Sequence, residues 1–302
     1  MLEITPTNDG LKVRTPAKVN LTLRVLGIRD DGYHALESLV CAVSLFDTLD
    51  LSPADSLTLV CDDPAMPTGD DNLVMKAARL LARECGKTRG ARIRLQKRIP
   101  AGRGFGGGSS DAAATLAGLD RLWGCGLASY DLAALGAKIG SDVPLFFGSP
   151  CSVMRGRGEQ IEPVDAEPPW HLVLAWPDFG LPTLDVYKAY DRLPEGANGA
   201  PAAATEILER LDSPAREARL FLVNDLEPAA AVVRGPRTDV RAILQNAGAA
   251  ATAMTGSGSA YFALADTPDE AERVAQAVRA AGVEAWPATF LANNSRQKEP
   301  PS

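Results

Sequence analysis

One stretch of the chain reads Pro100-Ala101-Gly102-Arg103-Gly104-Phe105-Gly106-Gly107-Gly108-Ser109-Ser110-Asp111. Five glycines fall within seven of these positions, and glycine lets a backbone turn freely and approach a ligand closely. The apolar residues that follow recur at positions 112, 116, 119 and 123, a spacing that predicts a helix. Ser109, Ser110 and Asp111 are capping residue types at the junction. Because a helix N-terminus offers unpaired N–H groups and a positive dipole end to an anion, the stretch predicts a phosphate-binding loop rather than a flexible surface loop.

The best-known phosphate-binding signatures do not fit this stretch. A P-loop needs Gly-Lys-Ser or Gly-Lys-Thr after the glycines, and neither follows here. A dinucleotide-binding loop needs an acidic residue that closes a βαβ unit, whereas Asp131 lies at an expected helix start. A protein kinase needs a His-Arg-Asp catalytic loop, which the sequence lacks. The loop therefore indicates another class of phosphate-binding protein.

Length and composition are those of a globular protein with one or two domains. The chain has 302 residues, of which 46% are hydrophobic and 23% charged, so it can bury a large core. Its formal net charge of −7 gives no electrostatic reason to expect a nucleic acid or a membrane surface as partner. The sequence shows neither a basic-then-apolar leader nor an apolar run of the ~18 residues that a membrane span needs. We therefore expect a soluble, cytoplasmic protein.

The cysteines and histidines give no sign of a disulfide framework or a zinc site. Two histidines, His34 and His171, lie far apart. The cysteines lack a Cys-x-x-Cys pair and are odd in number, which suits a reducing compartment. They stand at Cys41, Cys61, Cys85, Cys125 and Cys151.

Apolar patterns predict a mixture of strands and helices. Residues 19 to 25 alternate, with Val19, Leu21 and Leu23 on one face and polar side chains on the other. Because strands and helices do not alternate regularly, we expect the α+β class rather than a parallel α/β sheet. Other strands are expected at 11–15, 36–51, 56–60, 91–97, 171–176, 261–265 and 283–286, and helices at 72–86, 112–123, 129–140, 205–211, 216–233, 239–247 and 267–282.

Glycine- and proline-rich segments predict where domains meet. Composition changes over 156–169, which suggests a boundary between an N-terminal domain over 1–160 and a C-terminal domain over 161–292. Residues 194–204 have the composition of a linker, and the polar residues 293–302 that of a disordered tail.

Three further motifs accompany the glycine loop. They are Pro16-Ala17-Lys18-Val19-Asn20-Leu21 with Gly32-Tyr33-His34, then Gly140-Ser141-Asp142-Val143-Pro144, and Thr255-Gly256-Ser257-Gly258. With the loop, they resemble the GHMP kinases, small-molecule kinases named after galactokinase, homoserine kinase, mevalonate kinase and phosphomevalonate kinase. Any one of these motifs is weak by itself, but four in this order, between about residues 12 and 290, are specific.

The resemblance implies a two-domain GHMP kinase fold of the α+β class, with an N-terminal lobe like domain 2 of ribosomal protein S5 and a ferredoxin-like C-terminal lobe. It also implies ATP and Mg²⁺ as cofactors. Within the family, Pro-Ala-Lys-Val-Asn-Leu, Asp-Gly-Tyr-His and Gly-Gly-Gly-Ser-Ser are most similar to kinases of non-mevalonate isoprenoid synthesis. Their acceptor is the 2-hydroxyl of methylerythritol linked to cytidine diphosphate. The alternatives are a homoserine- or mevalonate-type kinase and, more remotely, a non-catalytic RNA-binding module.

Lys18 and Asp142 match the catalytic pair of the family. An Asp can accept the proton of the acceptor hydroxyl, while a nearby Lys orients it and offsets charge on the moving phosphoryl group. The alternatives to a catalytic role are that Lys18 is a solvent-exposed cation at the start of a strand and that Asp142 caps the turn before Pro144.

The resemblance also assigns the ligand contacts. ATP phosphates are expected at Pro100, Ala101, Gly102, Arg103, Gly104, Phe105, Gly106, Gly107, Gly108, Ser109 and Ser110. For the Arg103 side chain, exposure to solvent without a ligand contact is the favoured alternative. The nucleotide base is expected at Asn72 and Lys97. The substrate is expected at Asn20, Tyr33, His34, Tyr187, Gly256, Ser257 and Gly258, where Tyr33 and Tyr187 stack on cytosine and His34 bonds its edge. No carboxylate can be assigned to Mg²⁺, since nothing singles out Glu159 or Glu162.

Overall fold

The computed structural model describes residues 1–86, 90–194 and 206–293, and the chain forms two compact units. The first unit comprises Met1–Ala17, Leu45–Pro100 and Gly106–Ser149. The second unit comprises Lys18–Ser44, Ala101–Phe105 and Pro150–Ser302. The sequence instead suggested consecutive domains with a boundary at residue 160. The segments of the two units alternate along the chain because two long strands, β2 (Gly10–Asn20) and β4 (His34–Ala54), each run from one unit into the other.

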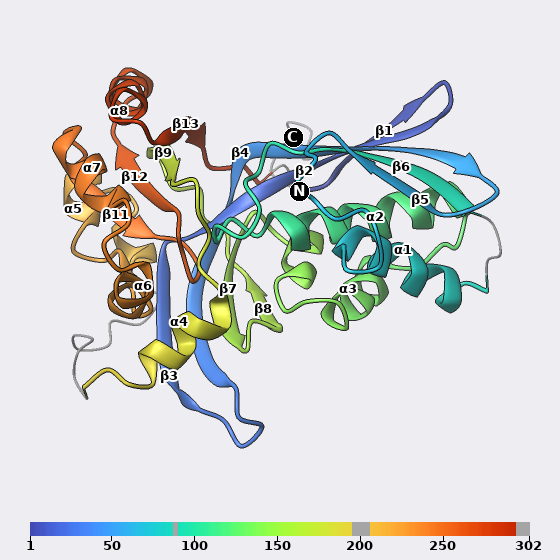
Figure 1. Cartoon of the computed structure of the whole chain (residues 1–302), viewed down its shortest axis with the longest axis horizontal. Coiled ribbons are helices and arrows are strands. Elements are labelled where there is room, and N and C mark those ends of the chain that lie inside the picture. The colour runs from blue at the N-terminus through green and yellow to red at the C-terminus, as the bar shows by residue number, and fades with distance from the viewer. Residues whose placement is uncertain (87–89, 195–205, 294–302) are drawn as a thin grey trace, which may run out of the picture. The chain divides into compact units, whose positions relative to one another are not determined.

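The first unit places helices on one face of a sheet (Figure 1). In that sheet β1 (Glu3–Thr7) pairs with β2, and the later part of β4 pairs with β6 (Gly90–Gln96), both antiparallel. Strand β5 (Thr58–Cys61) adds to β6 in parallel. The helical layer consists of α1 (Leu73–Glu84), α2 (Gly107–Trp123), α3 (Ser129–Ala137) and the 3₁₀ helix η1 (Val143–Phe147).

Helix α2 lies so close to the strands that it needs a glycine at position 118. A side-chain carbon at Gly118 would lie 2.3 Å from Leu51 Cδ1 and 2.9 Å from Val13 Cγ2. The alanines Ala112, Ala113 and Ala114 are fully buried. The small residues that follow the glycine loop therefore let the helix start lie deep in the unit.

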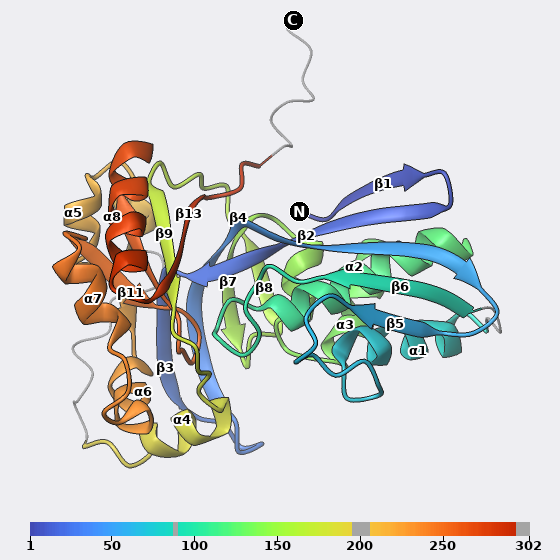
Figure 2. The ribbon, with the colours of Figure 1, turned by 45° about the horizontal axis from the view of Figure 1, so that its top comes forward.

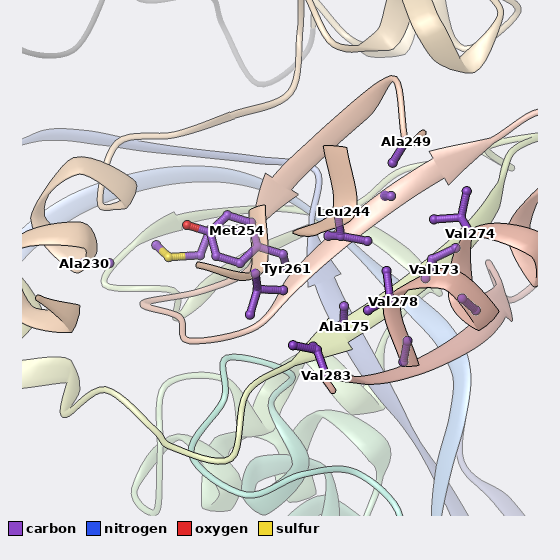
Figure 3. Packing of buried hydrophobic residues seen from close by; sticks show 14 of the residues in the cluster. Val173, Ala175, Ala230, Leu244, Ala249, Met254, Tyr261, Val274, Val278 and Val283 are labelled. Carbon is purple, nitrogen blue, oxygen red and sulfur yellow. The ribbon is translucent and has the colours of Figure 1, made fainter. Parts of the chain in front are cut away.

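The second unit contains a four-stranded antiparallel sheet in the order β11 (Ala251–Met254), β12 (Tyr261–Ala265), β9 (His171–Trp176), β13 (Glu284–Thr289). Helices α8 (Pro268–Ala280), α7 (Val240–Asn246) and α5 (Ala215–Ala218) contact this sheet, and Figure 2 shows α8 beside β9 and β13. Figure 3 shows Val173, Leu244, Tyr261, Val274 and Val278 within the buried cluster between them.

The remaining strands of this unit surround the early part of β4. Strands β3 (Thr22–Ile28) and β7 (Cys151–Gly156) pair with β4, β8 (Gln160–Pro163) pairs with β7, and β10 (Val223–Asn224) pairs in parallel with β3. Helices α4 (Thr183–Tyr190) and α6 (Glu227–Arg234) contact each other, and η2 covers Leu208–Arg210.

Further sequence expectations need correction. The helix expected over 216–233 is interrupted by β10, because residues 223 and 224 pair with β3, and Pro228 then lies in the first turn of α6. The polar side chains of Asn20, Thr22 and Arg24 are buried like their apolar neighbours. Cys41 and Cys151, which were expected to stay unpaired, form a disulfide between the neighbouring strands β4 and β7.

Two of the compositional expectations fall mainly outside the described residues. The expected linker 194–204 and tail 293–302 include only residues 194 and 293 of the described chain. No helix in the described ranges is long and apolar enough to cross a membrane.

Candidate active site

The glycine loop connects β6 to α2, as predicted. Gly102, Gly104 and Gly106 have φ values of 65°, 94° and 72°, a left-handed region that favours glycine. Gly106 is the N-cap of α2 and provides no side-chain cap, so a ligand can reach the N–H groups of the first turn. This local structure fits an anion-binding helix start.

The first half of the loop, Ala101–Phe105, belongs to the second unit and is fixed there by its carbonyl groups. Arg103 O accepts from Ala260 N at 3.0 Å, and Phe105 O accepts from Lys18 N at 3.0 Å. At Gly104 a side-chain carbon would lie 2.1 Å from Thr255 O. The loop thus contacts the lysine motif and the Thr255-Gly256-Ser257-Gly258 turn.

Phe105 anchors the same half-loop. Its side chain is fully buried, and its ring meets Trp176 edge to face with the centroids 5.8 Å apart. Apolar burial of an aromatic ring stabilises the loop where its glycines cannot. We therefore assign Phe105 an anchoring role in addition to its place in the loop.

The second half of the loop reaches the aspartate motif within the first unit. Ser110 is buried and donates from Oγ to Pro16 O at 2.6 Å, so its hydroxyl is already used. Ser109 is partly exposed, and a side-chain carbon at Gly140 would lie 3.7 Å from Ser109 Oγ. Asp142, two residues after Gly140, is half-buried and directly precedes η1. The structure therefore brings the start of α2 and the Gly140-Ser141-Asp142 motif together.

Lys97 occupies a buried ion cluster beneath the helix start. Its ammonium donates to Asp111 Oδ2 at 2.7 Å and to Asp47 Oδ2. Asp47 Oδ1 also accepts from the backbone N–H groups of Arg98 and Ile99 at 2.6 and 2.9 Å. Burial, opposed by Lys97, raises the pKa of the Asp111 carboxyl to about 8. Although burial alone would lower the pKa of Lys97, the two carboxylates raise it.

The side chains of the two residues expected at the nucleotide base thus make contacts within the protein. The Lys97 side chain belongs to the buried cluster. Asn72 is the N-cap of α1, where Oδ1 accepts from Val74 N at 2.9 Å and Nδ2 donates to Pro67 O at 2.7 Å.

Lys18 is buried in the second unit beside Asn20. Lys18 Nζ donates to Asn20 Oδ1 at 2.6 Å, and the same oxygen accepts from Gly256 N at 2.9 Å. Asn20 Nδ2 donates to Ser38 Oγ at 2.8 Å. Asn20, expected to bind substrate, therefore also joins Lys18 to the turn at Gly256.

An aromatic and imidazole cluster also forms in the second unit. The rings of His34 and Tyr187 lie with centroids 4.8 Å apart at 30°, and Tyr190 meets His34 edge to face at 5.9 Å. His34 Nε2 and Asp191 Oδ1 are 2.7 Å apart. Tyr33 is largely exposed, with the Arg157 guanidinium 4.9 Å from its ring centroid. His34 and Tyr187, both expected to contact the substrate, therefore lie in contact with each other.

Sequence reasoning missed Tyr190 and Asp191. The spacing could have indicated them, because residues three and four positions after Tyr187 lie on the same face of a helix as Tyr187. It also missed Asp178-Phe179-Gly180, the tripeptide of protein kinases, which is present in this sequence. Here the backbone carbonyl of Asp178 accepts from Arg103 Nη2 at 2.8 Å, and the sequence still lacks the His-Arg-Asp loop of protein kinases.

Comparisons with known proteins agree with these motifs. A family model described as the GHMP kinases N terminal domain matches residues 72–149, and one described as GHMP kinases C terminal matches residues 202–284. A relative from Paramagnetospirillum magneticum is 41% identical over 93% of this chain and 99% of its own length. The chain belongs to the GHMP kinases.

Two relatives of this GHMP kinase share a name. The Paramagnetospirillum magneticum protein and one from Salinispora tropica, 40% identical over 90% of this chain and 89% of its own length, are each called 4-diphosphocytidyl-2-C-methyl-D-erythritol kinase. A crystal structure of 4-(cytidine 5'-diphospho)-2C-methyl-D-erythritol kinase is similar with a TM-score of 0.78 and 40% identity, covering 92% of this chain and 98% of the other.

A homoserine kinase from Cytophaga hutchinsonii is similar in structure with a TM-score of 0.69 and 19% identity, over 97% of this chain and 98% of its own. This likeness shows the fold alone. The two-domain GHMP kinase fold of the α+β class is confirmed, and as a member of a kinase family the protein uses ATP.

Proposed function

We propose that this GHMP kinase transfers the γ-phosphoryl group of ATP to the 2-hydroxyl of 4-diphosphocytidyl-2-C-methyl-D-erythritol, an intermediate of non-mevalonate isoprenoid synthesis. The observation that carries the proposal is the contact of His34 with Tyr187 and Asp191, in the same unit as Lys18. A pyrimidine-bearing substrate needs a ring to stack on and a polar group at its edge. The names of the relatives support the same acceptor.

The donor phosphates bind, in this proposal, at the glycine loop. Three positive-φ glycines and the first turn of α2 offer backbone N–H groups, and Gly108 is partly exposed there. Pro100–Ser110 form the loop, although Ser110 and Phe105 act as anchors because their side chains are buried. Asn72 and Lys97 have less support as contacts of the base, since their side chains are engaged.

Asp142 and Lys18 act on the acceptor. Asp142 accepts the proton of the attacking hydroxyl, so that the oxygen can attack phosphorus while ADP leaves. Lys18 offsets the negative charge that accumulates on the transferred group. Its bond to Asn20 Oδ1, 2.6 Å long, holds the ammonium in place.

The substrate's cytosine stacks on Tyr33 and Tyr187 and bonds to His34 at its edge. The Asp191 carboxylate near Nε2 orients the imidazole, because a carboxylate can only accept a hydrogen bond. The turn at Gly256, Ser257 and Gly258 lies beside Lys18, since a side-chain carbon at Gly256 would be 3.5 Å from Lys18 Nζ. That turn contacts the alcohol part of the substrate.

In this proposal Mg²⁺ binds together with the ATP phosphates and takes few ligands from the protein. Among the described residues, no three His, Cys, Asp or Glu side chains form a metal site. Mg²⁺ usually keeps several waters and binds substrate phosphates with few protein ligands, so such a site is not required. Ser109 Oγ would contribute, since Ser110 Oγ is used internally. Glu159 and Glu162 pair with Arg29 and Arg155, and no carboxylate is assigned to Mg²⁺.

The proposal places the reaction in the cytoplasm with a small-molecule substrate. ATP turnover measured against cytidine-linked methylerythritol, homoserine and mevalonate tests it. We expect a kcat/KM at least ~100-fold higher for the cytidine-linked alcohol, because a site built for polar recognition rejects substrates that lack the group. Equal or higher turnover of homoserine or mevalonate would contradict the proposal and favour the other GHMP kinases.

A further inference from the structure

Arg103, inside the glycine loop, binds a segment far away in sequence. Its Nε donates to Pro177 O at 3.2 Å and its Nη2 donates to Asp178 O at 2.8 Å. Nη1 donates to Ala101 O in the loop itself at 3.3 Å. One guanidinium therefore joins the loop to residues 177 and 178. The side chain is partly exposed, as expected of a solvated group, but its guanidinium is also held by three carbonyls.

The segment approaches the loop closely because residue 180 is glycine. A side-chain carbon at Gly180 would lie 2.7 Å from Arg103 Nη1 and 2.7 Å from Gly102 O. The segment is also fixed to the glycine turn near the C-terminus. Ser259 Oγ donates to Phe179 O at 2.5 Å, and Thr183 Oγ1 and Ser257 Oγ are 2.9 Å apart.

The same segment leads directly into α4, which carries the aromatic cluster. Helix α4 begins at Thr183, and Tyr187 lies one turn later with its ring against His34. The loop segment 101–105, residues 177–183 and α4 all belong to the second unit. A continuous set of hydrogen bonds and one short stretch of chain thus connect the glycine loop to the proposed cytosine contacts.

We propose that Arg103 is a positioning residue that couples the two substrate sites, so that ATP on the glycine loop strengthens binding of the cytidine-bearing substrate. Fixing the loop on phosphates fixes Arg103 and through it residues 177–183, and the second ligand then has less motion to remove. The coupling is reciprocal in binding free energy. The identity of the second ligand rests on the proposed function.

Lysine cannot replace Arg103 in this role. The planar guanidinium presents several N–H donors in fixed directions, and here it serves carbonyls of three residues. An ammonium is a compact charge without that geometry. A positive charge alone is therefore insufficient for the coupling. The lysine variant thus distinguishes a positioning role of Arg103 from simple electrostatic attraction of phosphate.

Calorimetric binding of a non-hydrolysable ATP analogue and of CDP, each alone and each with the other present, tests the coupling. In the wild type we expect either ligand to tighten the other about 5- to 10-fold, within the usual range of such couplings. In Arg103→Ala and Arg103→Lys the factor falls to about 1, whatever the affinity of each variant for either ligand alone. Arg98→Ala is the matched control: Arg98 bonds Lys97 O and Asp62, and it keeps the coupling. Retained coupling in either Arg103 variant would overturn the inference.

Hydrogen exchange separates this inference from the proposed function. The ATP analogue alone should slow exchange of the amides of residues 178–181 and 183 in the wild type and in Arg98→Ala, but not in Arg103→Ala. If CDP binds to none of the proteins, the proposed substrate fails and the exchange result alone decides the coupling. Should Arg103→Ala not fold, Gly180→Ala separates the same segments, and we expect the same loss. The inference is overturned if the ATP analogue protects these amides equally in the wild type and in the Arg103→Ala or Gly180→Ala variant. It is also overturned if the analogue gives no protection in the wild type.

Discussion

At the scale of single residues, Lys97 shows how burial decides what a charged side chain does. One ammonium lies between two buried carboxyl groups, and Asp111 Oδ1 has no hydrogen-bond partner among the described residues. Breaking such a cluster by removing one charge can cost several kcal/mol, about 3–5 in known cases. The cluster holds the N–H groups of Arg98 and Ile99 just before the glycine loop.

Asp111→Asn should flatten the dependence of stability on pH. The folded-state pKa of Asp111 is raised above its ordinary 3.8, so the folded protein binds this proton more tightly than the unfolded chain. Stability contributed by the proton is therefore complete below about pH 4 and is lost as the pH rises towards about 8. Urea unfolding at about pH 5 and about pH 8 measures the difference.

We expect a smaller loss of unfolding free energy between these pH values in Asp111→Asn than in the wild type. Asp50→Asn is a control, because Asp50 makes only a partly exposed pair with Lys12 and should leave the slope nearly unchanged. An unchanged slope in Asp111→Asn would show that the carboxyl does not titrate in this range.

At the scale of elements, the glycines of the loop fall into two kinds. At Gly107 a side-chain carbon would lie 2.8 Å from Ile99 Cγ2 and 3.3 Å from Lys97 Nζ, so this glycine is needed for packing. At Gly108 the nearest atom, Leu73 Cδ1, is at an ordinary 3.4 Å. Only the second position tests phosphate binding without disturbing the fold.

Gly108→Val should weaken binding of an ATP analogue at least ~10-fold, because the branched side chain blocks approach to the helix N-terminus. Its melting temperature should stay within about 4 °C of wild type. Gly107→Val should instead lower the melting temperature clearly, through overpacking of about 1–3 kcal/mol. Calorimetry and thermal unfolding of the two variants provide the comparison. Unchanged ATP affinity in Gly108→Val would contradict the phosphate site.

The sequence predicts the elements that local patterns control. Asn72 at the start of α1 and the glycine loop before α2 are examples, since capping and backbone freedom act over a few residues. Asp47 could not be linked to Lys97 in this way, because their contact joins residues 50 positions apart. Nor could periodicity detect that β10 interrupts a helix-like segment, since the pairing partner is on β3.

At the scale of the whole molecule, the motifs are distributed over two units whose segments alternate along the chain. Lys18, the early loop and the aromatic cluster belong to the second unit, whereas α2 and Asp142 belong to the first. Motif order along the chain therefore does not reveal which motifs share a unit. Long strands such as β4 produce this alternation, because one strand supplies residues to both units.

Asp142→Asn should reduce kcat by roughly 10²- to 10⁴-fold, since the amide cannot accept the proton of the hydroxyl. Affinity for an ATP analogue and for CDP should change little, because Asp142 is not among the residues proposed to bind either. Single-turnover rates with calorimetric binding measure both. A loss confined to binding, with kcat preserved, would remove Asp142 from the role of base.

The central claim is that His34 and its aromatic neighbours select a cytidine-bearing acceptor. The most direct measurement is kcat/KM for cytidine- and uridine-linked methylerythritol with the wild type and with His34→Ala. We predict that the wild type prefers the cytidine form by at least ~100-fold, and that His34→Ala loses most of this preference. Equal kcat/KM for the two bases in the wild type, or an undiminished preference in His34→Ala, would contradict the claim.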